Sequence, residues 1–273
     1  MNAIILVAGK EKKLMPYTNQ MHQCLFRLAD DQTILGNMLE KLVALKKIDR
    51  IIIVVGHKKE LIFKELKEIK KKICFKNITC VENKDFLTTN VIYSLWLCRK
   101  YLLKPFLLLD GDIICEQELL EKLIHPANSR ENLLLADFDY KLGQSDNKIK
   151  VAHNRIVRIG KRVQLNRDSK FGRSIGIGKF SVGNSMFVKR MSELIRQDKK
   201  DLIYEDVLDE LLPCYIFRPV ATYGYNWMEV DNIEEFKKMN NIFSALDKLK
   251  AKALSLGATQ VFPINPEDIV FDS

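Results

Sequence analysis

Two carboxylates one residue apart follow an apolar segment, in Asp110-Gly111-Asp112 after Phe106–Leu109. Carboxylate oxygens are ligands that Mg²⁺ prefers, and Mg²⁺ commonly bridges them to substrate phosphates. A tight Asp-Gly turn is the alternative interpretation of the same three residues. A further carboxylate, Asp231, follows the apolar segment Trp227–Val230, where it could join the first pair at one metal or cap the next helix.

The loop after the first apolar segment is rich in lysine. Met1–Val7 is followed by Ala8-Gly9 and then by Lys10-Glu11-Lys12-Lys13. Backbone N–H groups in a tight loop after a strand can bind phosphate oxygens, and lysines add positive charge. An ordinary turn with solvated lysines is the alternative, so the loop alone indicates a phosphate site only weakly.

The order of the elements predicts how these residues are brought together. Strand patterns alternate with helical patterns, at 1–7, 32–45, 50–55, 58–72, 78–82, 90–103, 106–109 and 117–124. This alternation predicts an α/β fold, with a Rossmann-like mixed, mainly parallel sheet and helices on both faces. Because ligands of such folds bind outside the carboxyl ends of the strands, we expect a site beside Val7, Val55 and Asp110.

The pattern changes after residue 130. Shorter strands are predicted at 132–138, 148–151, 155–159, 176–182, 216–219 and 227–230, and helices at 184–198, 202–212 and 233–256. They suggest an antiparallel extension of the sheet or a small subdomain. We predict one domain over residues 1–245, and a C-terminal helix and linker over 246–273 that could begin a further domain.

Composition narrows the class of protein. The chain has 273 residues, of which 47% are hydrophobic and 29% charged, as in soluble globular proteins. The net charge of +9 favours phosphorylated ligands, but the lysines are spread out, so we predict no nucleic-acid partner. The apolar runs are too short for membrane insertion, and no secretory signal is recognisable, so we expect a cytoplasmic protein. The cysteines and histidines show no zinc-ligand spacing.

Taken in this order, the opening loop, the acidic pair and Asp231 resemble the nucleotidyltransferases of the sugar-nucleotide pyrophosphorylase type, closest to the phosphocholine and phosphonate cytidylyltransferases. The family loop L-x-A-G-x-G-x-R-L-x-P-x-T is matched at Leu6, Ala8, Gly9, Leu14, Pro16 and Thr18. Thr88–Trp96 is similar to the family segment T-x-N-N-x-x-S-L beside the nucleotide base, and Tyr204–Asp206 to its acidic pair before a helix. The resemblance implies a nucleotidyltransferase fold, related to the GT-A fold, up to about residue 245.

The resemblance also implies an activity. It is Mg²⁺-dependent transfer of CMP from CTP to a small phosphate or phosphonate acceptor, with release of pyrophosphate. Asp112 and Asp231 would hold the metal, and Lys13 and Lys161 would be catalytic, although Lys161 could equally be a solvated residue at a strand end. Glu205 and Trp227 would contact the acceptor, and a cationic choline or amine would suit the aromatic face beside a carboxylate. The implied nucleotide contacts are Leu6, Ala8, Gly9, Lys10, Lys13, Gln23, Asn83, Thr89, Asn90, Ser94 and Asp110.

Three positions depart from the family pattern. Glu11 replaces the second loop glycine, Lys13 replaces the arginine, and Gln23 replaces a phosphate-binding lysine. One alternative is therefore a catalytically weakened nucleotide-binding domain with a structural or regulatory role. A GT-A-type glycosyltransferase is a third interpretation of the two aspartates, but it leaves the Ala8-Gly9 loop and Asp231 unexplained. The sequence leaves a homodimer open.

Overall fold

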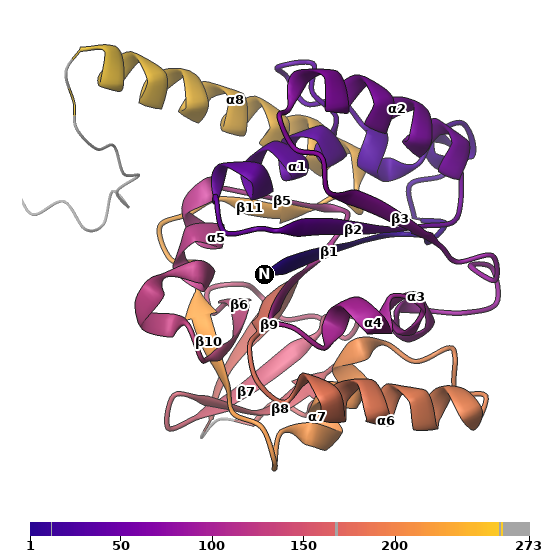
Figure 1. Cartoon of the computed structure of the whole chain (residues 1–273). Coiled ribbons are helices and arrows are strands. Elements are labelled where there is room, and N and C mark those ends of the chain that lie inside the picture. The colour runs from indigo at the N-terminus through magenta and orange to yellow at the C-terminus, as the bar shows by residue number, and fades with distance from the viewer. Residues whose placement is uncertain (12, 167–168, 257, 259–273) are drawn as a thin grey trace, which may run out of the picture.

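The computed structural model describes all residues except 12, 167–168, 257 and 259–273. Its centre is a nine-stranded mixed sheet in the order β10-β6-β9-β4-β1-β2-β3, with β7 paired to β9 and β8 paired to β7 (Figure 1). The strands of this sheet are β1 (Asn2–Val7), β2 (Arg50–Val55), β3 (Ile78–Glu82), β4 (Phe106–Asp110), β6 (Asn132–Asp137), β7 (Lys148–Ala152), β8 (Arg155–Gly160), β9 (Lys170–Phe180) and β10 (Phe217–Ala221).

Helices cover both faces of the sheet, as predicted. One face carries α1 (Ile34–Ala44), α2 (Lys59–Lys72) and α5 (Gln117–Ile124). The other carries α3 (Val91–Leu97), α4 (Arg99–Leu102), α6 (Asn184–Arg196) and α7 (Tyr204–Leu211). Short 3₁₀ turns occur at Tyr17–Asn19, Gln23–Leu25 and Pro126–Asn128.

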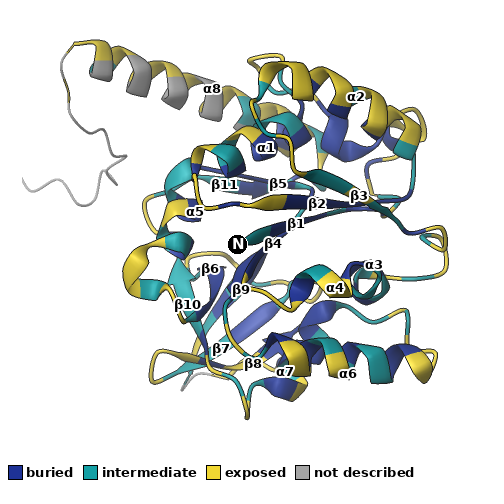
Figure 2. Ribbon diagram, viewed as in Figure 1, coloured by how far each residue is buried: buried dark blue, intermediate teal, exposed yellow. Residues whose placement is uncertain are grey.

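The central strands are apolar at successive positions because both of their faces are covered. In β1, Ala3, Ile5 and Val7 belong to the core under α1, α2 and α5. Ile4 belongs to the opposite core, with α3, α4, α6 and α7. Figure 2 shows the strands buried between these two helical layers. β1 pairs in parallel with β2 and β4, and β2 with β3, so the carboxyl ends of these four strands lie at one edge of the sheet.

The structure differs from the sequence-based predictions at three places. The helix predicted over 90–103 is interrupted at Cys98, whose N–H bonds to the Leu95 carbonyl three residues back instead of four. β9 begins at Lys170, before the predicted 176–182, because its polar first half pairs with β7. β5 (Ile113–Cys115) was not predicted, since three residues are too few for a pattern, and it pairs with β11 (Trp227–Glu229).

The chain ends, as far as it is described, in the long helix α8 (Ile233–Ser255), which extends away from the sheet layers (Figure 1). The predicted boundary between residues 245 and 246 falls inside this helix. Of the helix and linker predicted over 246–273, residues 257 and 259–273 lie outside the described residues. The two-part division of the chain therefore stays a prediction. No helix in the described part of the chain is both long and apolar enough to span a membrane.

Candidate active site

The acidic turn after β4 crosses the end of β1. The Gly111 N–H donates to the Leu6 carbonyl at 3.0 Å. A Cβ at residue 111 would lie 2.7 Å from that oxygen and 2.1 Å from Cγ1 of Val7, so only glycine fits. This close crossing places Asp110 and Asp112 beside the start of the lysine-rich loop, at the edge where the sequence predicts the site.

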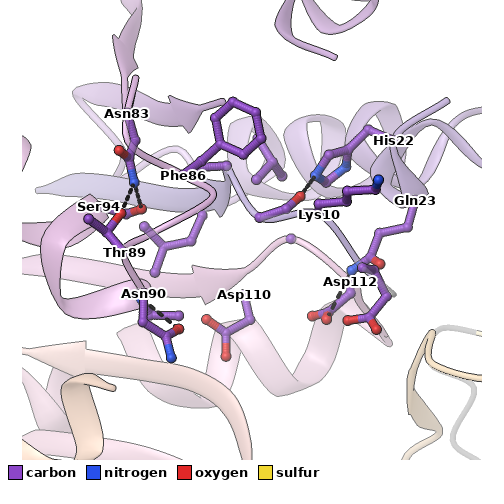
Figure 3. Close-up of a pocket in the computed structure, with 17 residues that line it drawn as sticks. Lys10, His22, Gln23, Asn83, Phe86, Thr89, Asn90, Ser94, Asp110 and Asp112 are labelled. Atoms are coloured by element: carbon purple, nitrogen blue, oxygen red, sulfur yellow. Dashed lines mark hydrogen bonds between the residues drawn. The ribbon is translucent and has the colours of Figure 1, made fainter. Parts of the chain in front are cut away.

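A cavity of about 410 Å³ opens at this edge (Figure 3). Eleven of the predicted site residues line it, and they come from the end of β1 and the loop after it, from the segment before α3 and α3 itself, and from the end of β4 and the turn after it. They are Leu6, Ala8, Gly9, Lys10, Gln23, Asn83, Thr89, Asn90, Ser94, Asp110 and Asp112. The structure thus brings nearly all of the predicted nucleotide contacts to one pocket, which we call the nucleotide pocket.

One end of the nucleotide pocket is a wall of neutral polar groups. The Asn83 amide donates to the hydroxyls of Thr89 and Ser94, each at 3.0 Å. Asn83 also accepts from the Asp85 N–H at 2.9 Å, so its orientation is fixed. Asn90 begins α3 by accepting from the Val91 N–H at 2.8 Å. Figure 3 shows this wall at the opposite end of the cavity from Asp112. Hydroxyl and amide groups held in this way suit the edge of a base.

The other end of the nucleotide pocket is acidic. Burial, together with the neighbouring charge of Glu229, raises the pKa of Asp112 to about 7. Burial, with the neighbouring charge of Asp112, also raises the pKa of Asp110. The Gln23 amide donates to Asp112 Oδ2 at 3.1 Å, while its own oxygen is buried and without a partner among the described residues. Gln23 therefore supports Asp112 and adds no positive charge to the pocket.

Asp231 lies beside Asp112, on the neighbouring chain segment. The Val230 N–H donates to the Asp112 carbonyl at 2.9 Å, which fixes the two segments together. The Asp231 carboxylate bonds to Lys13 Nζ at 2.9 Å. This hydrogen bond raises the pKa of Lys13. Lys13 is thus directed at the acidic end of the site and is not among the residues lining the nucleotide pocket.

The acidic end fits a hard divalent cation. Asp112 and Asp231 offer oxygen ligands, and a cation would offset the cost of keeping Asp112 ionised while buried. In the described part of the chain, no group of three His, Cys, Asp or Glu side chains forms a complete metal site. Mg²⁺ at these two residues would therefore need further oxygens from phosphates and water, which is its usual mode of binding.

Glu11 folds back onto its own loop. Its Oε1 accepts from the Lys13 N–H at 2.7 Å, and its carbonyl accepts from the Thr18 hydroxyl at 2.7 Å. Glu11 also lines the nucleotide pocket, and its charge helps to raise the pKa of Asp112. The Lys13 backbone N–H, which could otherwise bind a phosphate oxygen, is thus bonded to the Glu11 carboxylate of the same loop.

His22 is a site residue that the sequence analysis missed. Its Nδ1 accepts from the Cys24 N–H at 3.1 Å, so its Nε2 carries the proton and donates to the Gly9 carbonyl at 3.0 Å. Burial lowers the pKa of His22 to about 4, which keeps the ring neutral. The neutral ring anchors Gly9 at the wall of the pocket. No sequence pattern around His22 indicates that its ring bonds to the Gly9 carbonyl, so the sequence could not predict this role.

A second pocket of about 310 Å³ adjoins the acidic end, and we call it the second pocket. It contains the predicted residues Trp227 and Asp231, and the Trp227 indole N–H donates to Asp137 at 2.8 Å. Its remaining lining was not predicted from the sequence. It consists of Asp137, Tyr140, Arg173, Met228, Glu229, Glu235 and Lys238.

The last two predicted residues lie elsewhere. Glu205 is buried, accepts from Asn147 at 2.8 Å and from the Tyr204 hydroxyl, and has a pKa raised to about 7 by burial. The side chain of Lys161 is exposed, and its positive charge acts against that rise. Neither residue lines the nucleotide pocket or the second pocket. Their catalytic and acceptor-binding roles stay predictions.

The geometry agrees with a comparison of the whole sequence against known families. The sequence model of the family described as nucleotidyl transferase matches residues 2–144, more than half of the chain. The chain belongs to this family. Its fold and the resemblance stated above are thereby confirmed, and family membership disfavours the interpretation as a glycosyltransferase.

Curated relatives match over most of this chain. The Bifunctional protein GlmU of Methanococcus maripaludis strain C7 is 25% identical over 255 residues, 92% of this chain and 56% of the relative. That of Methanococcus vannielii is 25% identical over 251 residues, 89% of this chain and 55% of the relative. The chain thus spans little more than half the length of these relatives.

Solved structures of similar fold include two that are named for the use of CTP. The CTP:phosphocholine cytidylyltransferase of Streptococcus pneumoniae has a TM-score of 0.71 at 20% identity, over 89% of this chain and 98% of that chain. The inositol-1-phosphate CTP transferase of T. maritima has a TM-score of 0.70 at 20% identity, over 89% of this chain and 94% of that one. At these identities the likeness shows the fold.

Proposed function

We propose that this chain is an enzyme that transfers CMP from CTP to a small phosphorylated or phosphonate acceptor, with Mg²⁺ as cofactor and pyrophosphate as second product. The observation that carries the proposal is the division of one pocket into a neutral polar wall and an acidic end. The wall lies around Asn83, and the acidic end lies around Asp112, where a second pocket adjoins. A nucleotide beside Asp112 and an acceptor beside Asp231 can thus meet where the Val230 N–H holds these two chain segments together.

In this proposal the residues of the chain position the two substrates. The base lies against Asn83, Thr89 and Ser94, and the triphosphate runs along the loop towards Lys10 and Lys13. An acceptor oxygen forms a bond to the α-phosphorus while the bond to the bridging oxygen breaks, and pyrophosphate leaves in line. Mg²⁺ held by Asp112 and Asp231 would supply the charge neutralisation that such a transfer needs.

The proposed choice of CTP is supported by the names of two structures of similar fold. Two structures of similar fold are named for CTP, whereas another is named as a thymidylyltransferase of Bacillus anthracis, with a TM-score of 0.72 at 16% identity. The hydroxyl of Ser94 already accepts from Asn83 and keeps its proton to donate to an oxygen of a base. Cytosine and thymine both carry such an oxygen, and melting curves with the separate nucleoside triphosphates distinguish the two bases.

A nucleotide-binding role with weak catalysis is the second candidate function. Gln23 is neutral where the family has a lysine, and Glu11 is bonded to the Lys13 N–H at 2.7 Å. Both features reduce the positive charge available to a triphosphate. They do not remove the polar wall or the two aspartates, so nucleotide binding can persist when transfer is slow.

Two measurements on the purified chain separate these functions. Melting curves with each of the four nucleoside triphosphates and Mg²⁺ report binding, and pyrophosphate release with a panel of small phosphates and phosphonates reports transfer. We expect both signals with CTP, and loss of pyrophosphate release in Asp112→Asn. Asp198→Asn is the matched control, because Asp198 is exposed and has a left-handed backbone that asparagine tolerates. Stabilisation by CTP without pyrophosphate release would favour the binding role.

A further inference from the structure

The second pocket already contains a cation supplied by the protein. The Arg173 guanidinium lies 4.4 Å from the centre of the Tyr140 ring and 5.3 Å from that of Trp227. These two ring centres are 6.3 Å apart, so the guanidinium is within cation–π distance of both. Arg173 lies on β9 and Trp227 on β11, and both side chains line the second pocket together with Asp231.

Carboxylates hold the same guanidinium from other directions. Arg173 Nε lies 3.3 Å from Asp146 Oδ1, and one of its terminal nitrogens bonds to Glu229. The Arg173 side chain is only 11% exposed. Two aromatic rings and two carboxylates around one cation are the groups that recognise a quaternary ammonium or an amine. In this chain, Arg173 fills that recognition site.

A second cation would be poorly accommodated there. It would have to lie beside a fixed guanidinium, or displace it and leave Asp146 and Glu229 without their partner. Lys238 also lines the second pocket, together with the carboxylates of Asp137, Asp231 and Glu235. Asp231 is already bonded to Lys13, and Asp137 accepts from the Trp227 indole. Like charges placed together are an effective way of rejecting a wrong ligand, even where the shape of the pocket would admit it.

We propose that Arg173 determines acceptor specificity by occupying the space between Tyr140 and Trp227, and so excludes acceptors with a quaternary ammonium or amine head. The acceptor is then one whose non-phosphorylated part carries no positive charge. This rests on the proposed function in one respect, namely that the acceptor enters the second pocket. It replaces the sequence-based expectation that Trp227 binds a cationic choline or amine.

The test measures binding and does not need turnover. Choline chloride is titrated by calorimetry into the wild-type chain, Arg173→Ala and Arg173→Lys. We expect no saturable binding to the wild type or to the lysine variant, which keeps the charge. Arg173→Ala should bind choline at least about tenfold more tightly than the wild type, since the ion can then enter between two rings and two carboxylates. Trp227→Ala in the Arg173→Ala background should remove this gain.

Clear results would overturn the proposal. Saturable choline binding by the wild-type chain would overturn it. A folded Arg173→Ala protein that binds choline no more tightly than the wild type would also overturn it. If Arg173→Ala is too unstable for calorimetry, methylguanidinium, which can enter the space that the arginine side chain leaves, should raise the Tm of this variant but not of the wild type. The choline titrations do not depend on pyrophosphate release. Failure of the proposed transfer reaction can therefore be distinguished from failure of the proposal for Arg173.

Discussion

Glu11 is the residue through which nucleotide affinity can be changed most cleanly. Its carboxylate accepts from the Lys13 N–H at 2.7 Å and lines the pocket in which we place the triphosphate. Glu11→Gln keeps an oxygen that can accept the same hydrogen bond and removes only the charge. Glu11→Ala removes the charge and also frees the N–H for a phosphate oxygen. Glu11→Gln therefore measures the repulsion between the Glu11 charge and the triphosphate. The additional change in Glu11→Ala measures the competition between the Glu11 side chain and a phosphate oxygen for the Lys13 N–H.

The expected gain follows from Coulomb's law. For a charge ~8 Å from a phosphate, and an effective dielectric constant between ~20 and ~80, repulsion is about 0.5–2 kcal/mol. Glu11→Gln should therefore lower the Kd of CTP by a factor of about 2–30, and Glu11→Ala should lower it further. The gain from Glu11→Gln should shrink at high salt, because the group is partly exposed and its charge is screened.

Calorimetric titration of CTP with Mg²⁺ at two salt concentrations measures these changes. Glu121→Gln on α5 is the matched control, because it removes the same charge from a residue that lines neither the nucleotide pocket nor the second pocket. An unchanged or weaker affinity in both Glu11 variants would refute the account of the loop. It would mean that the carboxylate does not face the bound triphosphate.

Two further predictions concern stability. Because burial lowers the pKa of His22 from 6.5 to about 4, the folded protein binds fewer protons than the unfolded chain between these pH values. The difference in unfolding free energy between the wild type and His22→Asn should therefore fall by up to about 3 kcal/mol as the pH is lowered across this window, and a pH-independent difference in denaturant titrations would contradict this. Gly111→Ala should cost about 2–3 kcal/mol in the same assay, because its Cβ meets the end of β1. Gly9→Ala, whose Cβ would meet nothing within 4 Å, should change stability little, and equal effects of the two would refute the close crossing.

The sequence was informative where function depends on short segments. The apolar strands that end at Val7, Val55 and Asp110 could be predicted because burial on both faces requires continuous apolar runs. The edge at which they end could be predicted from their order, and the motif residues around Asn83 and Asp112 do meet there. These features depend on residues close together in the chain and on general rules of parallel sheets.

The remaining contacts join side chains that are distant in sequence. Lys13 bonds to Asp231, 218 positions away, and Gln23 bonds to Asp112, 89 positions away. Arg173 meets Trp227 only because β9 and β11 converge at the acidic end. No local pattern specifies such pairs, since each depends on how loops and strands pack. The sequence analysis therefore predicted that Trp227 contacts the acceptor and could not detect the guanidinium beside it.

The central claim is that the two pockets join a nucleotide to an acceptor. Mass spectrometry of a reaction with CTP, Mg²⁺ and an acceptor panel free of cationic head groups tests it most directly. The account predicts a new product equal in mass to one acceptor plus CMP less one water, formed in equal amount to pyrophosphate and absent in Asp112→Asn. Pyrophosphate accompanied by free CMP, or no new product while CTP still binds, would contradict it.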